Sequence, residues 1–127
     1  MIKLSSHSKK KLEDTFELWR VDKDFSDPMF NYLVYGWSPG SCFTAVLAND
    51  FARAIQTSHP ANSIPAFKAL TGWIGDHVPR NARGSYENVD RWIKLDPHLR
   101  RAELELKGLI YTEKQETWLA LSKPEHA

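Results

Sequence analysis

The sequence has a single cysteine, Cys42, among 127 residues. One cysteine excludes an internal disulfide framework and an all-cysteine zinc site, and it is typical of proteins from a reducing compartment. No stretch approaches the roughly 20 apolar residues that cross a bilayer. The lysine-containing start of the chain also lacks the uninterrupted apolar run of a secretory signal. We therefore expect a cytoplasmic protein without membrane contact.

The sequence also lacks an excess of charge of either sign. Seventeen Lys and Arg residues against 16 Asp and Glu residues give a formal net charge of +1. This near-neutral total provides no broad positive electrostatic potential that would attract a polyanion such as nucleic acid. An anionic partner would therefore have to be small. The length and the ordinary proportion of apolar residues, 42%, predict one globular domain over residues 1–127.

Common catalytic and cofactor motifs such as HExxH, CxxC and the phosphate-binding loop GxxxxGK[ST] are missing. The five histidines include no pair at metal-ligand spacing on a helix: His7, His59, His77, His98 and His126. Cys42 is predicted at a helix start, where the helix dipole lowers a thiol pKa, but no histidine lies nearby in sequence as a base. We expect a buried, inert cysteine, no metal, no cofactor and no enzymatic activity.

Helix signals dominate residues 26–95, which follow a polar arm over residues 1–25. Interleaved aromatic residues indicate that part of this arm packs on the domain. Short polar residues followed by apolar residues at helical spacing predict helix starts in the core. These starts are at Ser26, which precedes Asp27-Pro28, and at Ser41, Ser63 and Ser85. The Ser41 helix is expected to continue through Asn49-Asp50 to His59-Pro60.

The sequence of residues 96–127 predicts a different secondary structure for the C-terminal part of the chain. Asp96-Pro97 would start a helix that runs through Lys107 and stops at Gly108. Residues 109–112 and 117–121, separated by a polar turn, resemble the two strands of a β-hairpin. The expected fold is thus a compact, mainly α domain with a short C-terminal β-hairpin, which gives it a winged-helix-like end.

Two Gly-Ser helix entrances are the strongest candidates for a binding site. A helix N-terminus presents free N–H groups and partial positive charge, and glycine allows an anion to approach the backbone closely. Arginines near the second entrance suit phosphate oxygens, and an aromatic ring would stack on a base. The predicted ligand-binding residues are Trp37, Gly40, Ser41, His77, Arg80, Arg83, Gly84, Ser85 and Tyr86. Capping serines and solvated arginines give the same pattern without a ligand.

Asn49 and Asp50 interrupt the apolar sequence of the predicted Ser41 helix. A partly buried Asp50 needs a hydrogen-bond donor, either Arg53 one turn later or a backbone N–H elsewhere. We interpret the two residues as a structural polar pair between helices rather than as ligand contacts.

Two alternatives remain open for the function. In a winged helix, residues 97–107 would be the recognition helix, and Arg100, Arg101 and Lys107 would contact nucleic-acid phosphates. Four glutamates in the same region, Glu103, Glu105, Glu113 and Glu116, would repel a phosphate backbone. The other alternative is an inhibitor of a host protein, with Trp19 and Trp118 as aromatic anchors.

The segment Pro39-Gly40-Ser41, followed by Phe43-Thr44-Ala45-Val46-Leu47 and by Asn49-Asp50, resembles a motif of small accessory proteins from tailed phages and prophages. Gly84-Ser85 adds weaker similarity, and the resemblance covers about residues 30–95. Cys42 replaces the usual aromatic residue, and Tyr86 replaces a proline. The resemblance implies a phage gene product in the bacterial cytoplasm and provides no activity or site residues. Together with the candidate site, it leads us to expect a homo-oligomeric counter-defence protein that sequesters a small anionic nucleotide.

Overall fold

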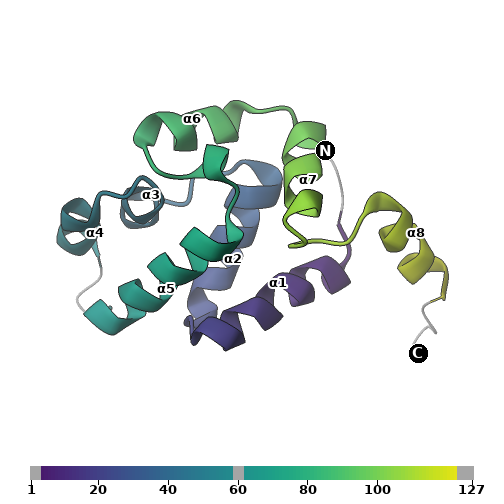
Figure 1. Ribbon diagram of the computed structural model, residues 1–127, viewed down its shortest axis with the longest axis horizontal. Helices are drawn as coiled ribbons and strands as arrows, with labels where there is room; N and C mark the ends of the chain where they lie inside the picture. The colour runs from purple at the N-terminus through teal and green to yellow at the C-terminus, as the bar shows by residue number, and fades with distance from the viewer. Residues whose placement is uncertain (1–3, 59–61, 123–127) are drawn as a thin grey trace.

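The computed structural model describes residues 4–58 and 62–122, and all regular structure in these ranges is helical (Figure 1). The α-helices are α1 (Ser6–Trp19), α2 (Ser26–Phe30), α3 (Ser41–Leu47), α4 (Phe51–Thr57), α5 (Ile64–His77), α6 (Tyr86–Lys94), α7 (Pro97–Leu106) and α8 (Glu113–Ser122). Two 3₁₀ turns, η1 (Lys23–Phe25) and η3 (Arg80–Ala82), and a π-helical turn, η2 (Asn31–Tyr35), connect them. The predicted mainly helical class is confirmed.

The segment formed by α2 and η2 lies at the centre of the molecule, with α1, α6 and α7 packed around it. Tyr32 and Leu33 on η2 are completely buried. The Tyr32 hydroxyl donates a 2.6 Å hydrogen bond to the Ala82 carbonyl oxygen, and Trp92 Nε1 lies 3.2 Å from the Tyr32 carbonyl oxygen. These bonds satisfy the polar atoms that the large aromatic side chains bring into the core.

Most predicted helix starts are confirmed by their capping hydrogen bonds. The side chains of Ser63, Ser85 and Asp96 each accept a hydrogen bond from a backbone N–H in the first turn of α5, α6 and α7, respectively. The Ser26 and Ser41 starts differ, because Phe25 and Gly40 occupy the N-cap positions of α2 and α3 and no side chain caps either helix. Ser41 is instead the first residue of α3.

The long helix predicted from Ser41 is wrong, because the chain breaks into α3 and α4. Asn49 adopts a left-handed conformation with φ of 65°. Asp50 then starts α4 as its N-cap, and its carboxylate accepts a 3.2 Å hydrogen bond from the Arg53 N–H. Asparagine tolerates the left-handed region better than most residues, and aspartate is a favoured N-cap. The polar pair therefore forms a turn between two short helices.

The predicted C-terminal β-hairpin is also wrong, since α8 occupies its second half. Thr112 and Gln115 form a reciprocal capping box at the start of α8. Thr112 Oγ1 accepts from the Gln115 N–H at 3.2 Å, and Gln115 Oε1 accepts from the Thr112 N–H at 2.9 Å. This Thr-x-x-Gln spacing is a helix-start signal in the sequence. It outweighs the β-propensity of the residues around it.

The N-terminal arm forms α1, whose apolar side packs on α5. Leu12 and Phe16 are buried, and Phe16 meets Trp73 edge-on with ring centroids 4.8 Å apart. At the end of α1, the Trp19 ring lies against Gly72, where a Cβ would stand 2.8 Å from it. The absence of a side chain at Gly72 therefore allows α1 to pack closely on α5.

Candidate functional site

A cleft of about 290 Å³ opens where α3, α4 and α6 meet. It is lined by Ser38, Gly40, Ser41, Thr44, Arg53 and Tyr86. The cleft therefore combines one cation, several hydroxyl groups and an aromatic ring, contributed by three helices and the loop before α3. This composition suits a small polar ligand with negative charge.

Gly40 shapes the floor of the cleft. Its φ of 91° and ψ of 169° lie outside the regions that other residues readily adopt, and a Cβ at this position would meet nothing within 4 Å. The Gly40 carbonyl oxygen accepts a 2.9 Å hydrogen bond from the Thr44 N–H, which closes the first turn of α3. The glycine is thus required by backbone conformation, and it leaves open space beside Ser41.

Asp50 and Tyr86 join α4 to α6 at the edge of this cleft. The Tyr86 hydroxyl donates a 2.7 Å hydrogen bond to Asp50 Oδ2. This bond, together with the Arg53 N–H, lowers the pKa of Asp50 from its usual value. The same bond raises the pKa of Tyr86, so its hydroxyl stays protonated and is a poor base. Asp50 also lies close enough to Arg53 to offset part of its positive charge.

The structure brings only part of the predicted site together. Gly40, Ser41 and Tyr86 line the cleft, and Ser85 caps α6 immediately beside it. Trp37 does not line the cleft, although the following residue, Ser38, does. The Trp37 ring is about half exposed and lies beside Tyr35, with centroids 5.7 Å apart.

The basic residues predicted for the phosphate lie elsewhere. Arg83 donates hydrogen bonds to the carbonyl oxygens of Val78 and Gly75 at 3.0 and 3.3 Å, so it caps the C-terminal end of α5. With Gly84 it borders a second cleft of about 260 Å³ on the other side of the 83–86 segment. Arg80 is exposed on η3 and does not line the cleft at Tyr86.

His77 is directed into the protein rather than toward the cleft. Its ring packs on Trp73 with centroids 5.3 Å apart, and its Nε2 lies 3.4 Å from Asp76 Oδ2. Burial lowers the pKa of His77, and this effect outweighs the opposing influence of Asp76. The neutral imidazole is therefore favoured, and it provides no positive charge for a phosphate at neutral pH.

The arrangement expected for a nucleic-acid contact is not formed. Arg100 is 4% exposed, and its guanidinium donates to the backbone carbonyl oxygens of Val34 and Leu95. Arg101 is half-buried and pairs with Glu105 at 2.8 Å. Lys107 is exposed at the end of α7. Because Arg100 faces the core and α8 replaces the wing, these three residues do not form one basic surface.

Ser38 is the central residue of the segment Gly36–Gly40. Gly36-Trp37-Ser38-Pro39-Gly40 matches the GxSxG pattern of serine hydrolases, in which the serine follows a strand and precedes a helix. Here a π-helical turn precedes it. Among the described residues that line the cleft, none is a histidine. Tyr86, which also lines the cleft, has its pKa raised by the hydrogen bond to Asp50, so its hydroxyl stays protonated. The match does not assemble a nucleophile with its base.

The structure also gives the surroundings of Cys42 and bears on possible metal ligands. The Cys42 thiol donates to the Ala54 carbonyl oxygen at 3.4 Å, and burial raises its pKa, contrary to the lowering expected at a helix start. His59 and His126 lie outside the described residues. Within residues 4–58 and 62–122, no three His, Cys, Asp or Glu side chains converge as metal ligands.

Sequence reasoning missed Arg53, Ser38 and Thr44 as parts of the cleft. Arg53 and Thr44 lie nine residues apart, on two helices that had been predicted as one. The Asn-Asp pair was the available signal, because it marks the turn that brings α4 back beside α3.

No protein-family model matches the chain, and neither a curated protein nor a solved structure is significantly similar to it. Among the described residues, no helix has both the length and the apolar character needed to cross a membrane.

Proposed function

We propose that this protein acts by binding, and that its ligand is a small anionic nucleotide held in the cleft between α3, α4 and α6. The observation that supports this most is the convergence of Arg53, the Ser41 hydroxyl and the Tyr86 ring at one cleft. Arginine binds phosphate oxygens through a planar fork, hydroxyl groups donate to the same oxygens, and an aromatic ring stacks on a base.

The charge balance of the cleft narrows the ligand class. Arg53 is the one cationic side chain among the described lining residues, and Asp50 at the edge offsets part of its charge. A ligand with a single negative charge, such as a phosphodiester, fits this balance better than a triphosphate. We therefore favour a cyclic nucleotide or another phosphodiester over a nucleoside triphosphate.

The biological role follows from the resemblance to phage accessory proteins. A phage protein that holds a nucleotide messenger of the host would keep it from its receptor, and this is a counter-defence function. The cleft is open to solvent, so tight enclosure of a messenger would need a second subunit. We accordingly propose sequestration by a homo-oligomer.

Isothermal titration calorimetry tests the proposal with a panel of linear and cyclic nucleotides and with inorganic phosphate. We expect heat with at least one phosphodiester and loss of that heat in Arg53→Ala. Arg80→Ala is the matched control, because it removes an exposed arginine outside the cleft. A folded protein that gives no heat with any compound contradicts the proposal, as does equal loss of binding in the two variants.

A further inference from the structure

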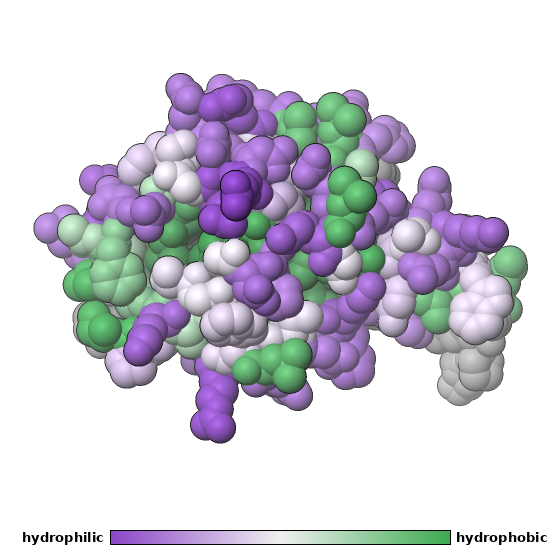
Figure 2. Space-filling model, viewed as in Figure 1, coloured by the Kyte–Doolittle hydropathy of each residue, from purple (hydrophilic) through white to green (hydrophobic). Residues whose placement is uncertain are grey.

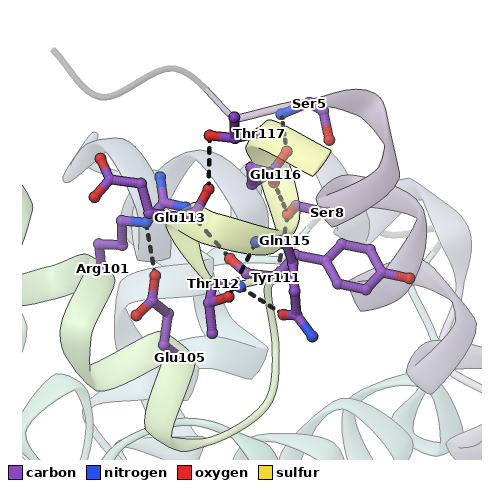
Figure 3. Close-up of polar contacts among 10 residues, drawn as sticks. All are labelled: Ser5, Ser8, Arg101, Glu105, Tyr111, Thr112, Glu113, Gln115, Glu116 and Thr117. Atoms are coloured by element: carbon purple, nitrogen blue, oxygen red, sulfur yellow. Dashed lines mark hydrogen bonds and ion pairs between the residues drawn. The ribbon is translucent and has the colours of Figure 1, made fainter. Parts of the chain in front are cut away.

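Helix α8 is attached to the rest of the protein mainly by polar contacts (Figure 3). Glu116 accepts a hydrogen bond from the Ser5 N–H at 3.1 Å and another from the Ser8 hydroxyl. Ser8 also accepts a 3.1 Å hydrogen bond from the Tyr111 N–H. No described side chain of α8 is fully buried. A helix of this length that buries so little is only marginally stable by itself in water, so these contacts and its capping box hold it.

The outer face of α8 carries two large apolar side chains that the described part of the chain leaves exposed. Trp118 is 65% exposed and Leu121 is 82% exposed. They are three residues apart and therefore lie on one face of the helix, opposite to Glu116. In Figure 1, α8 projects from one end of the molecule. Exposed aromatic and aliphatic residues on one helix face are typical of a docking element.

A groove of about 630 Å³ lies between the end of α1 and the start of α5. Trp19, Pro65, Ala66 and Ala69 form its apolar wall. Figure 2 shows further apolar side chains at the neighbouring end of the molecule, over α4 and the start of α5, where Phe51, Ile55 and Ile64 are exposed. Ile64 directly precedes the groove residue Pro65 in the chain, so exposed apolar side chains adjoin the groove.

The α8 helix of the same chain does not fill this groove. Glu116 holds α8 beside Ser8 near the start of α1, whereas Trp19 is the last residue of α1. The eleven helical steps from Ser8 to Trp19 correspond to about 16 Å along the helix axis. The apolar face of α8 and the groove are thus at opposite ends of α1, so a contact between them has to be intermolecular.

We propose that copies of this protein associate head to tail, with α8 of one copy docked in the Trp19 groove of the next. The charges at the two surfaces are complementary. Arg20, Asp22 and Lys68 border the groove and give it a net charge of +1, whereas Glu113, Lys114 and Glu116 give α8 a net charge of −1. Lys114 lies one turn before Trp118 on the docking face, and Asp22 at the groove provides an acidic partner for it.

The size of the contact predicts its strength. One short helix in a groove buries less than the roughly 800 Å² per partner of a standard interface. The association is therefore weak and depends on concentration. Because the two surfaces differ, the contact is heterologous, and it produces closed rings or open chains rather than only symmetric dimers.

Light scattering coupled to size-exclusion chromatography tests the proposal over a range of loading concentrations. We expect the average mass to rise with concentration, and Trp118→Ala in α8 to weaken the association roughly tenfold or more. Ala69→Arg in the groove wall and the charge reversal Lys68→Glu, at an exposed position, are expected to act in the same direction. Leu106→Ala is the matched control, because Leu106 is 84% exposed on α7 and lies outside both surfaces.

Mixing the variants distinguishes the head-to-tail contact from other modes. Trp118→Ala keeps an intact groove and Ala69→Arg keeps an intact α8, so their mixture is expected to form one-to-one dimers that neither variant forms alone. Circular dichroism checks that each variant is folded. A wild-type protein that stays monomeric at millimolar concentration overturns the proposal. So does association that Trp118→Ala abolishes while both groove variants leave it unchanged, because that result indicates contact between two α8 helices.

Discussion

The guanidinium of Arg100 fills the space beside Gly36. A Cβ on Gly36 would lie 2.8 Å from Nη1 of Arg100 and 2.9 Å from the Ile93 carbonyl oxygen. The same guanidinium donates hydrogen bonds to the carbonyl oxygens of Val34 and Leu95. Arg100 on α7 therefore caps the C-terminal ends of both η2 and α6, where a positive charge is favourable.

Gly36→Ala is expected to destabilise the fold by about 2–4 kcal/mol, since the left-handed φ of 70° is unfavourable for alanine and the new methyl group clashes with Arg100. Guanidinium chloride denaturation measures the change. Gly108→Ala is the control: its φ is 73° and nothing lies within 4 Å, so only the backbone cost of about 1–2 kcal/mol applies. Equal losses in the two variants would show that the contact with Arg100 contributes nothing.

Two glycines of α5 provide a second matched pair. In Gly75→Ala the new methyl group meets nothing within 4 Å, and the gain in helix propensity is expected to stabilise the protein by about 0.5–1 kcal/mol. In Gly72→Ala the methyl group would lie 2.8 Å from the Trp19 ring, which has to move. We expect this variant to be less stable than the wild type in thermal denaturation. A stabilised Gly72→Ala protein would show that Trp19 rearranges without cost.

The half-buried position of His77 predicts a loss of stability in mild acid. Its pKa is lowered in the folded state, whereas the unfolded chain takes up a proton near the ordinary value of about 6.5. Below that pH the unfolded state binds more protons than the folded state, so the free energy of unfolding falls as the pH falls. Above it both states are neutral at this residue and the effect disappears.

The comparison between the wild type and His77→Phe isolates this contribution, because phenylalanine can still pack on Trp73. The stability of the wild type relative to the variant is expected to decrease between pH 7 and pH 5, measured by urea denaturation at each pH. A difference that is constant over this range would mean that the pKa of His77 is not lowered by folding. An NMR titration of the His77 ring measures the pKa directly.

Thr112→Ala is expected to loosen α8 without unfolding the rest of the protein. The substitution removes the side-chain acceptor for the Gln115 N–H, and loss of such a cap costs about 0.5–2 kcal/mol of helix stability. Because no described side chain of α8 is fully buried, global unfolding is expected to change little. Hydrogen exchange should become faster within residues 113–122 only. Exchange that becomes faster throughout the core would show that α8 is an integral part of it.

The helix starts were predictable because their causes are local. Ser63 and Ser85 each bond to an N–H three residues later, which sequence spacing alone reveals. The break at Asn49 was not predictable in the same way. It depends partly on Gly84, whose N–H donates a 2.8 Å hydrogen bond to the Leu47 carbonyl oxygen at the end of α3. A contact between residues so distant in sequence leaves no periodic pattern.

The same distinction between local signals and long-range contacts explains which parts of the candidate site were predictable. Glycine and serine at helix entrances were recognised from sequence, and Ser41 and Tyr86 do face one cleft. The positive charge for the phosphate was assigned to Arg80, Arg83 and His77 instead of Arg53, because the sequence does not show which of these side chains the fold engages elsewhere. Arg83 donates its hydrogen bonds to carbonyl oxygens at the end of α5, whereas Arg53 stays exposed beside the cleft.

The position of Arg100 in the chain has a consequence for biosynthesis. The carbonyl oxygen of Val34 that it caps lies 66 residues earlier in the sequence. Protein segments generally begin to fold from the N-terminus as they leave the ribosome. A nascent chain that has emerged only as far as α6 contains most of the aromatic core but not the residue that closes two of its helix ends. We therefore expect stable packing of the core to follow the synthesis of α7.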